Sequence, residues 1–322
     1  MLPLSFVGQA PDDFGRTKGW TMHLPKVLFA LIMLSGAARA EELTGTLQKI
    51  KETNRIAFGF QEASVPFSYL DGDQKPIGYS LDICLRILEA VQKKLDIANV
   101  KIEFVSVTSS NRIPLLSNGT IDLVCGSATN NAERQRQVSF TNTHFLSATR
   151  FAAKRSGNIN TIDDLKGKAV TAVSGSTNLV QLNRVNNERN LGIRILPAQD
   201  QSEGFLMLET DRAAAFVLDD IQLAVAIARS KSPSAFMIST EAFSRAEPFG
   251  IMLRKDDESF KAVADQATAA LYRSAEIEAI YKKWFESPVP PNGVNFDAPM
   301  SQVLRSALAH PSDSPDPASY RQ

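Results

Sequence analysis

Cysteine and histidine are scarce in this chain of 322 residues, which has two Cys and three His. No C-x-x-C pair is present, and this excludes the zinc and thioredoxin-type sites that use that spacing. The histidines, at positions 23, 144 and 310, are too dispersed to assemble a metal cluster or a Ser-His-Asp arrangement. The sequence therefore predicts no metal, no cofactor and no catalytic residue.

The chain also lacks net charge. Lys and Arg together number 35, as do Asp and Glu, so the formal net charge is zero. Without a field of one sign, neither nucleic acid nor an anionic membrane is expected as the main partner. The length and the 43% hydrophobic content suffice for a sizeable core and favour two domains.

The N-terminus has the pattern of a secretory signal. Val27–Gly36 is an apolar run that follows two lysines and precedes the small-residue site Ala38–Ala40. The run is too short for a comfortable membrane span, although a short uncleaved anchor is an alternative. A start at Met22 would also give a normal signal. We expect residues 1–40 to be a signal peptide and the mature protein to be periplasmic.

The two cysteines, Cys84 and Cys125, therefore belong to an exported protein, in which a disulfide is an alternative. Cys84 falls within an amphipathic helix pattern, and Cys125 ends a buried strand. We predict two separate, buried thiols.

Two arginines follow hydroxyl-rich loops in the segment Ser109–Gln137. Arg112 comes after one loop and Arg134 after the other, with the apolar strand Ile121–Cys125 between them. A guanidinium offers two parallel donors that match a carboxylate, and free amides at a helix start would add to this. The segment favours a small carboxylated solute, with a solvated loop and an ordinary surface helix as the alternative.

Strand and helix patterns alternate along the mature chain, which predicts parallel sheets covered by helices. The expected strands are 55–60, 101–107, 121–125, 149–154, 169–173, 193–196, 214–218 and 250–253. The expected helices are 81–94, 113–117, 161–165, 177–189, 201–210, 220–228, 260–272 and 277–285.

This order predicts two α/β lobes, the second inserted into the first. Lobe 1 comprises residues 41–145 and 249–290, and lobe 2 comprises residues 146–248. The two segments in which the chain passes from one lobe to the other would form a hinge. We expect the folded part to end at the proline-rich residues 288–291, and the tail 291–322 to be partly disordered from His310 onward because it is rich in Ser, Pro and Asp.

Each polar cluster follows a predicted strand, and solute pockets in α/β folds lie at the carboxyl ends of strands. The sequence therefore predicts that these clusters meet in one site. They are Gln61–Ser64, Ser109–Arg112, Gly126–Arg134, Ser174–Thr177, Asp200–Gln201 and Asp219–Asp220.

Several strings are similar to those of the extracytoplasmic solute-binding proteins of polar amino-acid ABC transporters, family 3, and to its glutamate/aspartate-binding branch. They are A-S-V-P-F-S-Y at 63–69, T-S-S-N-R-I-P-L-L-S-N-G-T at 108–120, C-G-S-A-T-N-N-A-E-R-Q at 125–135 and D-L-K-G-K-A-V at 164–170. The resemblance implies a type II periplasmic-binding-protein fold and a monomer that delivers an amino acid to a membrane ABC permease.

The resemblance also implies roles for residues that would hold the ligand α-carboxylate. Arg134, in the E-R-Q string, would bind that carboxylate. Thr129 would add a backbone N–H and a hydroxyl. Ser176 and Thr177 of the S-G-S-T turn would close on the same group from the second lobe.

The remaining roles concern the α-ammonium and the ligand side chain. By the resemblance, Asp219 would meet the ammonium, with Asp220 as the alternative, and Ser127 would also accept from it. Arg112 and Ser109 would face the side chain. A zwitterion needs such an opposed pair of charges, since burying either charge alone is costly.

Two glutamines depart from the glutamate/aspartate branch. Gln61 stands where the branch has an arginine, and Gln201 where it has a histidine. Both positions contribute to side-chain binding in the branch. Because glutamine can donate or accept, aspartate, glutamate, their amides and other small polar amino acids all remain compatible.

Two other classes of function are alternatives. A periplasmic cyclohexadienyl dehydratase resembles this family, and such an enzyme would need a positioned acid such as Glu62 or Glu203. No pair of titratable groups is arranged for that chemistry, so we predict that the chain is not an enzyme. A sensory ligand-binding domain is the second alternative.

Overall fold

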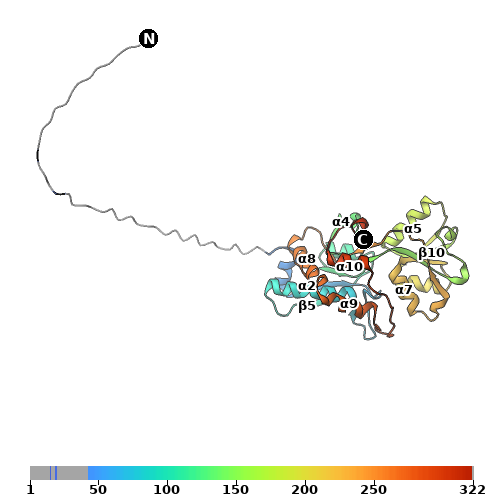
Figure 1. Ribbon diagram of the computed structural model, residues 1–322, viewed down its shortest axis with the longest axis horizontal. Coiled ribbons are helices and arrows are strands. Elements are labelled where there is room, and N and C mark those ends of the chain that lie inside the picture. The colour runs from blue at the N-terminus through green and yellow to red at the C-terminus, as the bar shows by residue number, and fades with distance from the viewer. Residues whose placement is uncertain (1–14, 16–18, 20–42, 321–322) are drawn as a thin grey trace, which may run out of the picture. The chain divides into compact units, whose positions relative to one another are not determined.

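The structure, a computed structural model, describes Gly15, Gly19 and residues 43–320. The chain divides into two units, residues 1–41 and 42–322, and all the described helices and strands belong to the second (Figure 1). Apart from the two glycines, the predicted signal peptide lies outside the described residues.

The first five-stranded sheet has the order β5-β1-β6-β15-β7 and forms the core of lobe 1. Its strands are β1 (Arg55–Phe60), β5 (Lys101–Ser106), β6 (Leu123–Cys125), β7 (Val138–Phe140) and β15 (Met252–Arg254). The helices of this lobe are α1 (Gly45–Thr53), α2 (Tyr79–Leu95), α3 (Arg112–Ser117), α4 (Ala132–Gln135), α8 (Glu258–Tyr272), α9 (Ala275–Phe285) and α10 (Gln302–Ala309). Helix α2 packs on the sheet because Ile83, Ile87 and Val91 recur at helical spacing and are fully buried.

The second five-stranded sheet, β11-β10-β12-β9-β13, forms the core of lobe 2. Its strands are β9 (Thr149–Lys154), β10 (Ala169–Val173), β11 (Arg194–Ala198), β12 (Ala215–Asp219) and β13 (Phe236–Ile238). Its helices are α5 (Thr177–Glu188), α6 (Gln201–Glu209) and α7 (Asp220–Arg229), with short 3-10 turns at Arg155–Gly157, Asp163–Leu165 and Pro233–Ala235. Figure 1 shows α5, α7 and β10 in lobe 2, and α2, α8, α9 and β5 in lobe 1.

Two short antiparallel strands, β8 (Phe145–Ser147) and β14 (Glu247–Phe249), join the lobes. All strands of the second sheet lie between them in the sequence, so lobe 2 is inserted into lobe 1, and the predicted two-lobe fold class is confirmed. The exact lobe boundaries at 145/146 and 248/249 stay a prediction. A small sheet of β2 (Ala63–Ser64), β3 (Ser68–Leu70) and β4 (Pro76–Ile77) completes lobe 1.

The expectation of parallel sheets holds only in part. Strand β1 runs parallel to β5 and β6, and β10 runs parallel to β11 and β12. Strands β9 and β15 instead pair antiparallel with their neighbours.

The prediction of two separate thiols is wrong. Cys84, in the second turn of α2, forms a disulfide with Cys125 at the end of β6, and their Cα atoms are 6.2 Å apart. The helix face that carries Cys84 packs directly over β6, which brings the pair within the usual bridging range.

The prediction that the fold ends at residues 288–291 and is disordered from His310 is also wrong. Helix α10 buries Leu304, Ala307 and Leu308, and the chain continues to residue 320 through the turn Pro317–Ser319. The Thr143 N–H donates to the Ser312 carbonyl at 2.8 Å, and the hydroxyls of Thr143 and Tyr320 lie 2.8 Å apart. These backbone and single-anchor contacts have no signature in composition.

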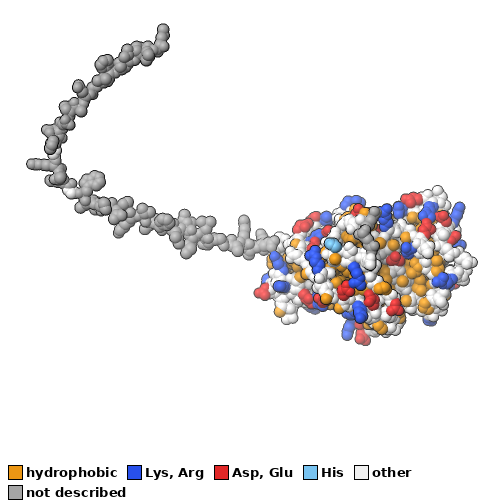
Figure 2. Space-filling model, viewed as in Figure 1, with side chains coloured by type: hydrophobic (Ala, Val, Ile, Leu, Met, Phe, Trp, Pro, Cys, Tyr) orange, Lys and Arg blue, Asp and Glu red, His pale blue; other side chains and the backbone are white. Residues whose placement is uncertain are grey.

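Acidic and basic side chains are interspersed over the face drawn in Figure 2, in keeping with a net charge of zero. Within the described part of the chain, none of the helices combines the length and apolar character that crossing a membrane needs.

Candidate functional site

A narrow cavity of about 10 Å³ lies between the two lobes. It is lined by Ser109, Arg112, Ser127 and Thr129 from lobe 1 and by Val173, Ser176, Thr177, Asn178, Gln201, Leu218, Asp219 and Gln222 from lobe 2. Eight of the ten predicted site residues are in this set; Arg134 and Gln61 are not among the lining residues. The cavity is about the size of one water molecule, so an amino acid enters only if the lobes separate.

Strand ends explain why these residues meet. The loop that carries Ser127 and Thr129 follows β6, Ser176 follows β10, and Asp219 is the last residue of β12. Both sheets direct the carboxyl ends of their central strands at the interface between the lobes. This is the placement that the order of strands and polar clusters predicts.

Arg134 bridges the two lobes. Its side chain is 7% exposed, and its guanidinium donates to the Thr129 carbonyl at 3.0 Å and to the Gly175 carbonyl of lobe 2 at 3.3 Å. Asn131 caps the short helix α4 by accepting from the Arg134 N–H at 2.9 Å, which fixes the backbone there. Burial lowers the pKa of Arg134 to about 10, partly offset by the negative charges of Glu247 and Asp219.

The start of α5 faces Thr129 across the cleft. The hydroxyls of Thr129 and Thr177 are 3.0 Å apart, and Ser176 caps α5 by accepting from the Leu179 N–H at 3.1 Å. Gly175 has φ +73° and lies so close to Ser110 that a Cβ there would be 2.6 Å from the Ser110 Cα. Glycine therefore permits the close approach of the two lobes.

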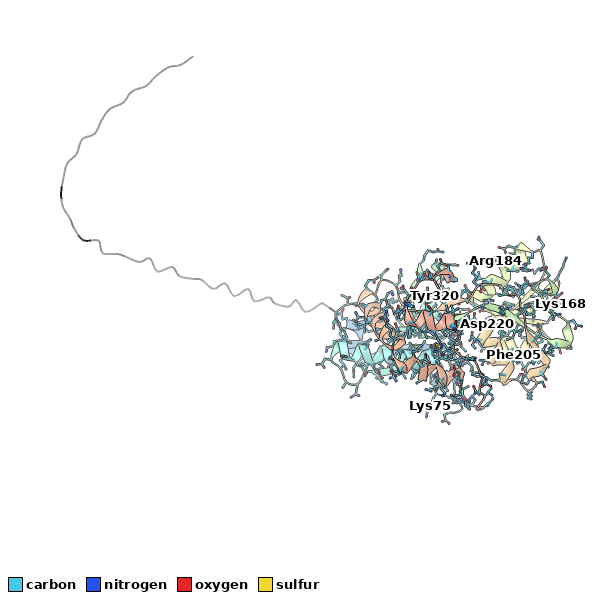
Figure 3. All side chains as sticks on the ribbon, in the orientation of Figure 1. Lys75, Lys168, Arg184, Phe205, Asp220 and Tyr320 are labelled. Atoms are coloured by element: carbon cyan, nitrogen blue, oxygen red, sulfur yellow. A yellow bond between two sulfur atoms is a disulfide. The ribbon has the colours of Figure 1, made fainter. Side chains whose placement is uncertain are left out.

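Asp219 is the acidic group of the cavity. It is 5% exposed and accepts from Asn178 Nδ2 at 3.1 Å, while burial raises its pKa to about 7. Its neighbour Asp220, labelled in Figure 3, instead accepts from the Ser147 hydroxyl at 2.6 Å and pairs with Arg150. Asp219 lines the cavity and Asp220 does not.

Arg112 has the most incomplete set of partners in the site. It is 2% exposed, and its Nε and Nη1 have no hydrogen-bond partner among the described residues. Burial, and then the positive charge of Arg134, hold its pKa well below the usual range. A buried guanidinium with free donors is costly unless an anion meets it.

The two departing glutamines differ in position. Gln61 is buried and does not line the cavity; its Nε2 lies 3.5 Å from the hydroxyl of Ser109, which does, and its Oε1 has no partner among the described residues. Gln201, the first residue of α6, is half-buried and lines both the cavity and a neighbouring groove of about 560 Å³.

Three polar residues at or beside the site were not predicted. Asn178 holds Asp219, Gln222 lines the cavity, and Glu247, whose pKa is raised by burial, accepts from Gln181 Nε2 at 2.7 Å near Arg134. Gln222 stands three residues after Asp219 at the start of a helix, and that spacing is a signal that could have found it. Glu247 lies on a crossing strand and has no such signal.

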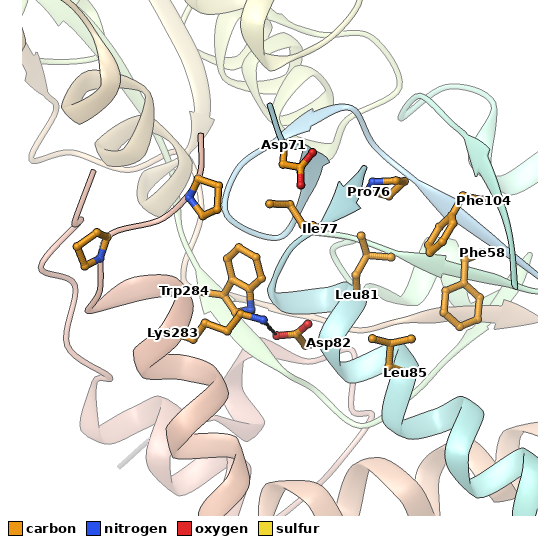
Figure 4. Close-up of a pocket in the computed structure, with 12 residues that line it drawn as sticks. Phe58, Asp71, Pro76, Ile77, Leu81, Asp82, Leu85, Phe104, Lys283 and Trp284 are labelled. Atoms are coloured by element: carbon orange, nitrogen blue, oxygen red, sulfur yellow. Dashed lines mark hydrogen bonds and ion pairs between the residues drawn. The ribbon is translucent and has the colours of Figure 1, made fainter. Parts of the chain in front are cut away.

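Features elsewhere are separate from this site. Figure 4 shows an apolar cavity of about 370 Å³ in which Trp284 Nε1 donates to Asp82 at 2.7 Å, and none of the predicted site residues lines it. Among the described residues, no group of three or more His, Cys, Asp or Glu side chains could hold a metal ion. His144 is fully buried, with its pKa lowered by burial to about 3, and lies 3.2 Å from the Ser80 hydroxyl.

Known proteins resemble this chain in sequence, and a solved structure resembles it in fold. The sequence profile of the bacterial extracellular solute-binding proteins, family 3, matches residues 56–287. The L-glutamate/L-aspartate-binding protein of Pseudomonas aeruginosa is 45% identical over 282 residues, which cover 87% of this chain and 93% of that protein. The glutamate/aspartate import solute-binding protein of Escherichia coli K12 is 41% identical over 290 residues, or 89% and 96% of the two chains. A solved ancestral arginine-binding protein bound to arginine has a TM-score of 0.64 at 27% identity, over 72% of this chain and 98% of that one.

Proposed function

We infer that this chain, which belongs to the bacterial extracellular solute-binding proteins of family 3, is the substrate-binding component of an importer and binds a polar amino acid. The family match and two relatives more than 40% identical over most of the chain support this role. We propose further that it works in the periplasm as a monomer and delivers its ligand to an ABC permease.

The two ends of an amino acid find opposite charges in the site. Arg134, Thr129 and the start of α5 offer donors for the α-carboxylate, and Asp219 and Ser127 offer acceptors for the α-ammonium. Lobe 1 carries Arg134 and lobe 2 carries Asp219, so the two charges approach each other only when the lobes close. The ligand would stabilise the closed state through contacts that the open state lacks.

We propose that the preferred ligand has an acidic side chain. The observation that carries this proposal is Arg112, a buried guanidinium whose Nε and Nη1 lack partners. Arg134 is already offset by the negative charges of Glu247 and Asp219, whereas Arg112 is opposed by Arg134 and offset by Asp219 alone. The side-chain carboxylate of glutamate or aspartate would give the free donors of Arg112 an anionic partner, whereas the side chain of glutamine would bring no charge.

An enzymatic role has less support. Glu62 is exposed, and Glu203 accepts from the Gln199 N–H at 2.7 Å; neither lines the cavity. We therefore keep the prediction that the chain binds its ligand without changing it.

Calorimetric titration of ligand-stripped protein against the twenty amino acids tests the proposed function. We expect saturable binding, tightest for glutamate or aspartate. The variant Arg112→Gln should weaken glutamate binding by at least about 100-fold while affecting glutamine far less. Arg136→Gln, an exposed arginine beside α4, is the matched control and should leave both affinities unchanged. Equal losses for glutamate and glutamine in Arg112→Gln would refute the role of Arg112.

A further inference from the structure

Gln222, in the first turn of α7, connects the two lobes. Its side chain is 3% exposed, and its Nε2 donates to the hydroxyl of Ser64 in lobe 1 at 2.8 Å. The Ser64 hydroxyl in turn lies 2.9 Å from that of Ser127, which lines the cavity. A continuous chain of three polar groups therefore crosses the cleft and ends in the binding cavity.

The other polar atom of Gln222 has no partner. Its Oε1 is buried and accepts no hydrogen bond from any of the described residues. Gln222 lines the cavity, and it stands one helical turn after Asp219, so the two side chains lie on the same face of the start of α7. A buried carbonyl oxygen without a donor is costly, and a ligand ammonium group bound in the cavity could supply one.

Building on the proposed function, we propose that Gln222 is a latch that senses the ligand. Its Nε2 holds Ser64 when the lobes are closed, and its Oε1 accepts a hydrogen bond from the α-ammonium. An ammonium has three N–H donors. Asp219 and Ser127 accept two of them, and Gln222 Oε1 accepts the third.

This arrangement joins ligand recognition to lobe closure in one side chain. In an open state, water can satisfy both the amide of Gln222 and the hydroxyl of Ser64. Closure removes that water, and the ligand then supplies the donor that Oε1 lacks. The ligand thus favours closure through a contact that exists only in the closed state.

The test combines Gln222→Met, Ser64→Ala and the double variant, each titrated with glutamate, and with glutarate by competition because glutarate lacks the ammonium. We expect Gln222→Met to weaken glutamate binding by about 10-fold and to speed glutamate dissociation. The double variant should lose less than the two single losses combined, since both changes break the Gln222–Ser64 bond and Ser64→Ala alone also removes the contact with Ser127. Preference for glutamate over glutarate should fall in Gln222→Met. Gln92→Met on α2 is the matched control and should bind like the wild type, and thermal melting confirms that each variant folds.

Two results would overturn the proposal. If the fold-losses in glutamate affinity of the two single variants multiply in the double variant, Gln222 does not act through Ser64. If Gln222→Met leaves the preference for glutamate over glutarate unchanged, Gln222 does not contact the ammonium. Failure of the wild type to bind any acidic amino acid would instead refute the proposed acidic ligand. The wild-type titration therefore separates the two failures.

Discussion

Replacing Asp219 by asparagine should abolish ligand binding and yet stabilise the ligand-free protein. Burial raises the pKa of this carboxyl from 3.8 to about 7, and the nearby charges of Glu247 and Asp220 add to the effect while Arg134 opposes it. Since one pKa unit corresponds to about 1.36 kcal/mol, keeping Asp219 ionised costs the closed, ligand-free form up to about 4 kcal/mol, and it costs less in an open form in which water reaches the carboxylate. Asparagine has the same shape and avoids this cost.

The gain in stability from Asp219→Asn should depend on pH. Because the folded pKa of Asp219 lies above the unfolded value, the neutral carboxyl favours folding fully below pH 4. That stability is lost as the pH rises through 7. Ligand-free wild type and Asp219→Asn should therefore melt at similar temperatures near pH 4. At pH 8 the variant should melt several degrees higher.

Thermal melts at pH 4 and pH 8, with and without glutamate, provide the assay. Glutamate should raise the melting temperature of the wild type at pH 8 and leave that of Asp219→Asn unchanged. Asp82→Asn, at a carboxylate outside the cavity that is bonded to Trp284, is a control that should not gain stability at pH 8. A ligand-free Asp219→Asn that melts below the wild type at pH 8 would refute the reasoning.

Three further predictions follow from the same contacts. Wild-type affinity for glutamate should fall by up to about tenfold per pH unit below pH 7, because Asp219 must be deprotonated to receive the ammonium; calorimetry between pH 5 and 8 measures this, and a flat profile would contradict it. Replacing Cys84 and Cys125 by alanine should lower the free energy of unfolding by about 4 kcal/mol, from the 41-residue separation of the pair; an unchanged urea midpoint would argue against that contribution. Deleting residues 311–322 should lower the melting temperature and weaken the binding of all amino acids to the same extent. The reason is that the Asp313 carbonyl accepts from the side chains of Asn130 and Gln135, which lie next to Thr129 and Arg134 in the sequence. A change in ligand preference would contradict this prediction.

The sequence was sufficient to predict which residues line the cavity wherever a side chain is positioned by the strand directly before it. Ser127, Ser176 and Asp219 each follow a strand whose apolar pattern is local, so the rule that sites form at carboxyl ends brings them together without knowledge of the fold. The roles drawn for these residues from the resemblance stay predictions. Glu247 could not be predicted in this way because it lies on the crossing strand β14, which carries no polar cluster, and it acts on Arg134 through its charge.

Long-range partners could not be predicted. Gln222 and Ser64 are separated by 158 residues, and only lobe packing brings them together. The prediction of two separate thiols failed for a similar reason, because a helix pattern and a strand pattern do not say which face of the helix packs on the strand. Beyond α10, the C-terminal segment is held by backbone carbonyls, the buried Tyr320 and an ion pair of Asp313 with Lys261, none of which a composition rich in Ser, Pro and Asp reveals.

The pKa shifts of Arg112, Arg134 and Asp219 all favour the neutral form of the group, and this explains why closure should depend on the ligand. Burial lowers the pKa values of Arg112 and Arg134 and raises that of Asp219, so each group is driven toward its neutral form when the lobes close without a ligand. An acidic amino acid supplies two carboxylates and one ammonium, which would reverse all three shifts at once. An amide ligand would reverse the shifts of Arg134 and Asp219 only. The energy of closure should therefore rank ligands by how completely they restore the charged forms, which makes Arg112 the residue that separates glutamate from glutamine.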